Sequence, residues 1–167
     1  MMLAPHTSPP GQGLRREIRR TGAGLIGLCG LYQVIVGVYF IALRPALLPE
    51  DIRYLATGVA SLHAGLPKLE SWLRLVFIVL GGQMAAVGVL LISSSLRTVH
   101  AKVGSRPELV LLGAAGVLSV GTMAGVNFVL GSDFRLLLIA PAVAWSVGLV
   151  LRVLSTVGSD AAVGARP

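Results

Sequence analysis

Three amide side chains are the residues of this chain best suited to bind a polar group in apolar surroundings. Gln33, Gln83 and Asn127 each lie inside a long uncharged run. An amide donates and accepts hydrogen bonds without carrying charge, so it suits a quinone carbonyl or the headgroup of a ligand. The same side chains can instead join neighbouring helices, at roughly 0.6 kcal/mol for each hydrogen bond. We favour this structural interpretation and keep Gln33, Gln83 and Asn127 as the candidate cofactor-binding cluster; nearby hydroxyls in the same runs are Ser119, Thr122 and Ser146.

Metal and redox chemistry have little support in the sequence. The single cysteine, Cys29, cannot form an intramolecular disulfide or a CxxC pair. The three histidines show no HxxxH or HExxH spacing, so we predict no metal site. His63 lies in a loop with three carboxylates and is the remaining candidate for a second polar site, with Glu50, Asp51 and Glu70.

Enzyme motifs are absent from the sequence as well. It contains no GxSxG nucleophile motif and no phosphate-binding Walker loop. The glycines in TGAGLIGL match GxGxxG, but no strand precedes them and they lie in an apolar run. We therefore predict no catalytic residue and lean against an enzyme.

The composition indicates the environment in which these residues act. Of 167 residues, 54% are hydrophobic and 13% charged, whereas soluble domains carry about 25% charge. The mean hydropathy is +0.82. These values favour an integral membrane protein. The net charge of +7 arises from basic residues that bracket apolar runs, which is typical of topology control rather than nucleic-acid binding.

Four apolar runs predict the fold. They cover 21–43, 75–92, 109–131 and 136–151, and we extend the last span to 134–154. A run of 23 residues makes a helix of about 34 Å, enough for a hydrocarbon core of about 30 Å. The first run is too long for a signal peptide. We predict an all-α integral membrane four-helix bundle with an amphipathic outer loop, in which Arg135 and Arg152 extend toward the headgroups.

The basic residues predict how the spans are oriented. Nine Lys and Arg residues fall on the side of the termini and five on the other: Arg15, Arg16, Arg19, Arg20, Arg97, Lys102, Arg106, Arg152 and Arg166 against Arg44, Arg53, Lys68, Arg74 and Arg135. This excess places both termini in the cytoplasm. The expected parts are a disordered basic tail at 1–20, the transmembrane domain at 21–154 and a cytoplasmic tail at 155–167, in a cell inner (plasma) membrane.

The outer loop at 44–74 carries a helical pattern. An apolar stripe recurs every three or four residues, at Ile52, Leu55, Val59, Leu62, Leu66, Leu69 and Leu73. Pro49, Glu50 and Asp51 form a typical helix start. We expect one or two short helices, broken at Gly58, Gly65 or Pro67, that cap the bundle or lie on the membrane.

Small residues predict where the spans approach one another. Helical spacing relates Gly27, Gly30 and Gly37 in the first span, Gly81, Ala85 and Gly88 in the second, and Gly121 and Gly125 in the third. We expect packing within one bundle, with homodimerisation as the alternative. Pro141 should kink the fourth span, and Trp145 either fills the bundle or lines a cavity.

Two segments resemble a known group of proteins. The first is VIVGVYFIALRPALL, which runs from the first span into the outer loop. The second is FIVLGGQMAAVGVLLI, with Gly-Gly followed by a small-residue stripe. With the short hairpin between spans three and four, the chain over about 25–153 is similar to DoxX-like and related small four-helix bacterial inner-membrane proteins. The resemblance implies a membrane subunit of a quinone-linked sulfur or redox system.

These observations lead to ranked expectations for function. The first is a non-catalytic accessory or partner- and lipid-binding subunit without a cofactor, in contact with the bilayer and with a membrane protein or a second copy. The second is a quinone-associated redox subunit, with quinone as its cofactor. The third is a small-solute carrier, which is disfavoured in its proton-coupled form because no ionisable residue lies well inside a span.

Overall fold

The computed structural model describes residues 12–100 and 106–164. Every regular element in this part of the chain is a helix. Four helices are long and apolar enough to cross a membrane, which confirms the predicted all-α four-helix fold. They run over Gly13–Ala42, Leu69–Val99, Arg106–Val129 and Arg135–Thr156. The chain is therefore a helical multi-pass membrane protein.

The helices that cross the membrane are longer than the apolar runs. Helix α1 covers Gln12–Ala42 and α4 covers Leu69–His100. The third span consists of α5 (Arg106–Gly116), a π-helical turn η1 (Val117–Gly121) and α6 (Thr122–Val129). Helix α7 covers Arg135–Gly164. Residues 12–20 of the predicted disordered tail are thus helical, and residues 1–11 lie outside the described part.

Helix α1 lies at the centre of the bundle. It packs along α4 on one side and along α7 on the other, while the third span packs on α7. Gly37 of α1 faces Gly81 of α4, and Gly30 faces Gly88, so closely that a Cβ atom would lie 2.5–2.7 Å from the opposite carbonyl oxygen. The two glycine stripes are therefore a packing seam, as predicted.

The glycines of the third span behave differently. A Cβ atom at Gly125 would meet no other atom within 4 Å, and one at Gly121 would meet only the carbonyl of Gly116. Packing within the bundle is therefore the wrong explanation for this GxxxG pair. The close contact of this span involves Gly116 instead, because the indole of Trp145 occupies the space where its Cβ would be. Trp145 thus fills the bundle.

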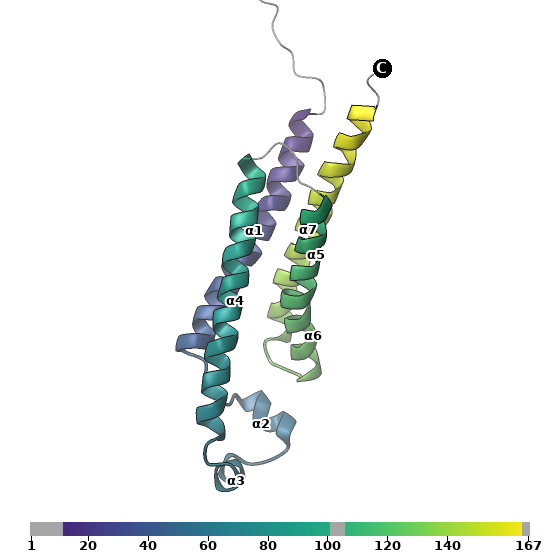
Figure 1. The fold of residues 1–167 in the computed structure, drawn as a ribbon. Helices are drawn as coiled ribbons and strands as arrows, with labels where there is room; N and C mark the ends of the chain where they lie inside the picture. Colours follow the sequence, from purple (N-terminus) through teal and green to yellow (C-terminus); the bar gives the residue numbers. More distant parts are fainter. Residues whose placement is uncertain (1–11, 101–105, 165–167) are drawn as a thin grey trace, which may run out of the picture.

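The two ends of the bundle differ. We call the end where α1 begins and α7 ends the terminal end, and the opposite end the hairpin end (Figure 1). The buried apolar core, formed by Ile26, Leu91 and Leu112 with Val87 and Leu149 packed against it, brings together residues of all four spans. Toward the hairpin end, Figure 1 shows α1 and α4 diverging from α6 and α7, with α2 below the opening.

Two short helices at the hairpin end confirm the pattern of the outer loop. Helix α2 (Pro49–Leu55) begins at the predicted Pro49, and α3 (Val59–Gly65) begins directly after Gly58. Both helices leave part of the apolar stripe exposed: Leu55 and Val59 are 47% and 43% accessible. In a membrane protein such side chains can contact lipid at the interface.

Candidate functional site

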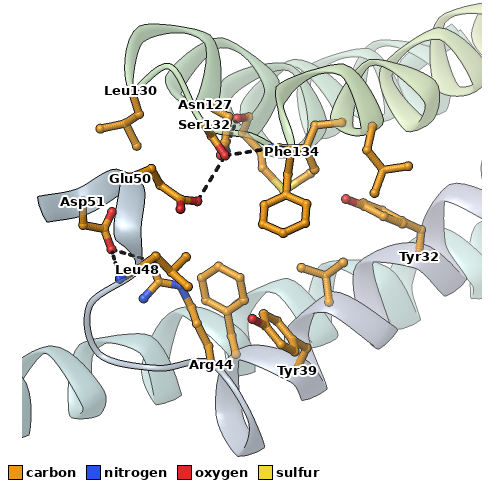
Figure 2. Close-up of a pocket in the computed structure, with 15 residues that line it drawn as sticks. Tyr32, Tyr39, Arg44, Leu48, Glu50, Asp51, Asn127, Leu130, Ser132 and Phe134 are labelled. Atoms are coloured by element: carbon orange, nitrogen blue, oxygen red, sulfur yellow. Dashed lines mark hydrogen bonds and ion pairs between the residues drawn. The ribbon is translucent and has the colours of Figure 1, made fainter. Parts of the chain in front are cut away.

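The opening at the hairpin end encloses a cavity of about 550 Å³, within the roughly 300–1,000 Å³ typical of small-molecule sites. We call it the hairpin-end cavity. Its lining comes from α1, α2 and the loop between them, and from α6, the α6–α7 turn and the start of α7 (Figure 2). Most of that lining is apolar or aromatic, and its charged groups lie at the start of α2 and in the loop before it. The lining residues are Tyr32, Val36, Tyr39, Phe40, Arg44, Leu48, Glu50, Asp51, Met123, Asn127, Leu130, Ser132, Phe134, Leu137 and Leu138.

The turn between α6 and α7 positions one of these polar groups. Gly131 adopts a left-handed conformation with φ of 62°, which glycine tolerates without steric cost. The next backbone amide, that of Ser132, donates to the carbonyl of Asn127 at 3.0 Å. The Ser132 hydroxyl accepts from the amide of Phe134 at 3.2 Å, as a helix cap does. This turn therefore fixes a buried hydroxyl at the edge of the cavity.

The carboxylate of Glu50 meets that hydroxyl across the cavity. Ser132 Oγ donates to Glu50 Oε1 at 3.3 Å, and Glu50 is only 5% exposed. Figure 2 shows the Glu50 side chain directed from α2 toward the α6–α7 turn. Among the described residues, no hydrogen bond reaches its second oxygen, Oε2. Glu50 is thus a buried carboxylate with one long hydrogen bond.

Arg44 and Asp51 form the second polar group of the cavity. Arg44 Nη2 lies 3.5 Å from Asp51 Oδ2, and the backbone amide of Leu48 donates to the same oxygen at 2.8 Å. The guanidinium also stacks on Phe77, 3.6 Å from the ring centroid. Burial lowers the pKa of Arg44, and the charge of Asp51 opposes that shift most strongly. Asp51 is therefore the principal partner of this partly desolvated cation.

Helix α2 is also tied to the α6–α7 turn at the surface. Arg53 Nη2 lies 3.0 Å from Asp133 Oδ2, and both side chains are more than half exposed. With the Glu50–Ser132 hydrogen bond, this ion pair holds α2 across the mouth of the cavity. These contacts suit α2 to act as a lid.

The structure separates the three predicted amides. Asn127 lines the hairpin-end cavity, and its Nδ2 donates to Met123 of its own helix at 2.9 Å. Gln33 is 1% exposed, and its Oε1 has no hydrogen-bond partner within the described ranges. Gln83 is exposed on α4. No hydrogen bond joins the three, all of which are described, so a role of Gln33 or Gln83 in binding stays a prediction.

The predicted interhelical hydrogen bonds are wrong for the other polar residues of the spans. Ser119, Thr122 and Ser146 all donate to carbonyls of their own helical segment, four or five residues back. Hydrogen bonds that do cross between the spans include those from Ser95 to the carbonyl of Ala23 and from Cys29 to the carbonyl of Pro141. A mid-helix hydroxyl readily satisfies itself on the preceding turn, which explains the error.

A second buried charge lies at the terminal end, where sequence reasoning expected an arginine extended into the headgroups. Arg152 is instead 1% exposed, and its Nη2 lies 3.2 Å from Glu108 Oε1. Ser94 donates to the same carboxylate oxygen at 3.0 Å. Arg152 and Glu108 are close enough for an ion pair, but their atoms are not aligned for a hydrogen bond. Nη1 and Nη2 of Arg152 therefore have no hydrogen-bond partner in the described part of the chain.

The predicted polar site around His63 does not form. His63 pairs with Glu70 at 2.8 Å at the surface, whereas Glu50 and Asp51 line the hairpin-end cavity. No group of three potential metal ligands occurs among the described residues. The residues missed as a cavity lining are Arg44, Ser132 and Phe134. One feature of the sequence could have indicated them: Arg44 and Ser132 to Phe134 lie directly outside the ends of apolar runs.

Comparisons with known proteins add no function. No protein-family model, no curated protein and no solved structure matches this chain.

Proposed function

We propose that this chain is a non-catalytic, amphiphile-binding protein of the bacterial inner (plasma) membrane that serves as an accessory subunit. The hairpin-end cavity carries the proposal, because an apolar lining with charged groups at one end matches an amphiphile. In this proposal the apolar tail contacts the side chains of α1, α6 and α7. The headgroup lies beneath α2, beside Glu50 and Arg44.

The sidedness follows from the charge distribution. Nine basic residues on the terminal side against five on the hairpin side support cytoplasmic termini. The cavity then opens toward the outer leaflet. The exposed Tyr54 and Trp72, at 60% and 58%, are suited to the membrane interface on that side. The DoxX-like resemblance belongs to the same proposal, since those proteins also belong to the inner membrane.

A substitution that fills the hairpin-end cavity tests this proposal. Val36 lines the cavity and is only partly exposed, whereas Val38, on the same helix, is 52% exposed and does not line it. The tagged protein would be purified from its membrane in a mild neutral detergent, and the retained small molecules identified by mass spectrometry. We expect Val36→Phe to lose a molecule that the wild type and Val38→Phe retain. Equal retention by all three proteins would contradict the proposal, and a stoichiometric protein partner would identify the complex.

A quinone is the second candidate ligand. The cavity lining includes hydroxyl and amide groups that can donate to a carbonyl, on Tyr32, Tyr39 and Asn127. A quinone-associated redox subunit would retain quinone in the same extraction. It would lose most of it in Asn127→Leu. An extract that contains lipids but no quinone would argue against this second function.

A further inference from the structure

We infer that the hairpin-end cavity selects amphiphiles whose headgroup is a positively charged ammonium, with Glu50 as the residue that recognises it. The inference deepens the proposed function and rests on it. The first observation is the charge of the lining. The cavity is lined by two carboxylates, Glu50 and Asp51, and by one cation, Arg44. One negative charge therefore remains in excess.

The second observation is which carboxylate carries the excess. Asp51 has Arg44 at 3.5 Å and the Leu48 amide at 2.8 Å, so its charge is compensated locally. Glu50 receives only the Ser132 hydroxyl, at 3.3 Å. Its electrostatic effect on Arg44 ranks below those of Asp51 and Tyr39. Glu50 is therefore the carboxylate that lacks a dedicated counter-charge.

The third observation is burial. The residue Glu50 is buried, with an exposed fraction of 5%. Burying a carboxylate is costly unless it is paired and hydrogen-bonded. A protein of marginal stability tolerates such a group where a ligand completes it. An ammonium in the cavity would supply both a counter-charge and hydrogen-bond donors to Glu50 Oε2.

The aromatic lining fits the same headgroup. Phe134 lies between Glu50 and Tyr32 in the view of Figure 2, and Tyr39 and Phe40 line the α1 side. Aromatic faces attract cations within about 6 Å. A primary ammonium would use Glu50 through hydrogen bonds, and a quaternary ammonium through charge and ring contacts. An anionic headgroup would meet the uncompensated carboxylate and be repelled.

A headgroup series with one constant tail tests the inference. Purified wild type, Glu50→Gln and Ser61→Ala would be incubated in neutral detergent with hexadecylammonium, hexadecyltrimethylammonium, hexadecanol or hexadecanoate. Ser61 lies on α3, is exposed and does not line the cavity, so it controls for handling. Native mass spectrometry measures the bound fraction. Because each amphiphile partitions into the same micelles, comparison between variants isolates the protein site.

The expected result is a preference for at least one ammonium amphiphile over hexadecanol. That preference should fall roughly tenfold in Glu50→Gln and remain in Ser61→Ala, as expected from loss of a charged hydrogen bond. Equal binding of all four headgroups, or an undiminished preference in Glu50→Gln, would overturn the inference while the proposed function stands. Absence of binding by every amphiphile, or equal competition by tailless butylammonium, would instead overturn the proposed function.

Discussion

Among the residues that the structure describes, each end of the bundle buries one charged side chain, but the surroundings of the two differ. At the terminal end Arg152 is 1% exposed, has a carboxylate at 3.2 Å and adjoins tightly packed spans. Gly22 and Gly148 approach there so closely that a Cβ at Gly22 would lie 2.9 Å from the opposite carbonyl. At the hairpin end Glu50 is 5% exposed and faces a cavity of about 550 Å³.

This difference separates a structural charge from a candidate recognition charge. A buried cation that is paired with a carboxylate of the same chain already has its partner, so loss of that partner should affect folding. A buried carboxylate beside a cavity has room for a partner from outside, so its removal should affect binding. Burial alone does not distinguish the two cases; the charged partner of Arg152 and the cavity beside Glu50 do.

Breaking the terminal-end pair should have the largest effect. Glu108→Gln leaves Arg152 buried without a counter-charge, and we expect the free energy of unfolding to fall by about 3–5 kcal/mol. Chemical unfolding in detergent micelles measures this change. The matched control is Glu70→Gln, which breaks the exposed pair with His63 and should cost less than about 1 kcal/mol.

A double variant sharpens this prediction. Glu108→Gln combined with Arg152→Met removes the unpaired charge and should recover much of the lost stability. If Glu108→Gln alone changes stability no more than Glu70→Gln does, the terminal-end pair is not a structural element. The contrast between the two ends would then lose its basis.

The glycine seam near the middle of the bundle should give the next largest effect. Gly88→Ala places a Cβ atom 2.5 Å from the Gly30 carbonyl oxygen, so the helices must separate, at a cost of about 1–3 kcal/mol. Gly82→Ala, on the same helix, meets no atom within 4 Å and should gain about 0.5–1 kcal/mol. Unfolding midpoints of the two variants that move in the same direction would refute the seam.

Glu50 should respond in the opposite way to Glu108. Glu50→Gln removes a buried charge held by one 3.3 Å hydrogen bond while keeping the shape of the side chain. We expect the ligand-free protein to keep its stability or gain about 1 kcal/mol. Thermal unfolding after extensive detergent exchange tests this. A loss comparable to that of Glu108→Gln would make Glu50 a structural residue.

The spans and the short helices follow from local patterns, which is why the sequence predicts them. Apolar run length determines the four spans, and the sequence Pro49, Glu50, Asp51 marks the start of α2. The helix ends are less predictable. Helix α1 begins at Gln12, well before its apolar run, because basic residues extend a helix that its apolar part has already nucleated.

The candidate site is less accessible from sequence, because its contacts join distant segments. Glu50 and Ser132 are 82 positions apart, and nothing in either local pattern indicates the other. The position of a residue within an apolar run also does not show whether its side chain points into the bundle or away from it. Gln33 and Gln83 both occupy the middle of a span, yet one is buried and the other exposed. Asn127 lines the hairpin-end cavity and the other two amides do not, so a binding role for Gln33 or Gln83 stays a prediction.

The smallest expected effect concerns the lid. Arg53→Ala removes the exposed ion pair with Asp133 and should change stability by less than about 1 kcal/mol. The pair nevertheless ties α2 to the α6–α7 turn, so its loss should favour opening of the cavity. We expect a bound amphiphile to dissociate about two- to fivefold faster, as a change below 1 kcal/mol allows.

Tyr54→Ala, also exposed on α2, leaves the pair intact and should keep the wild-type rate. If the amphiphile dissociates at the same rate from both variants, the Glu50–Ser132 hydrogen bond alone holds α2 over the cavity. The carboxylate that recognises the headgroup would then also control the mouth of the site.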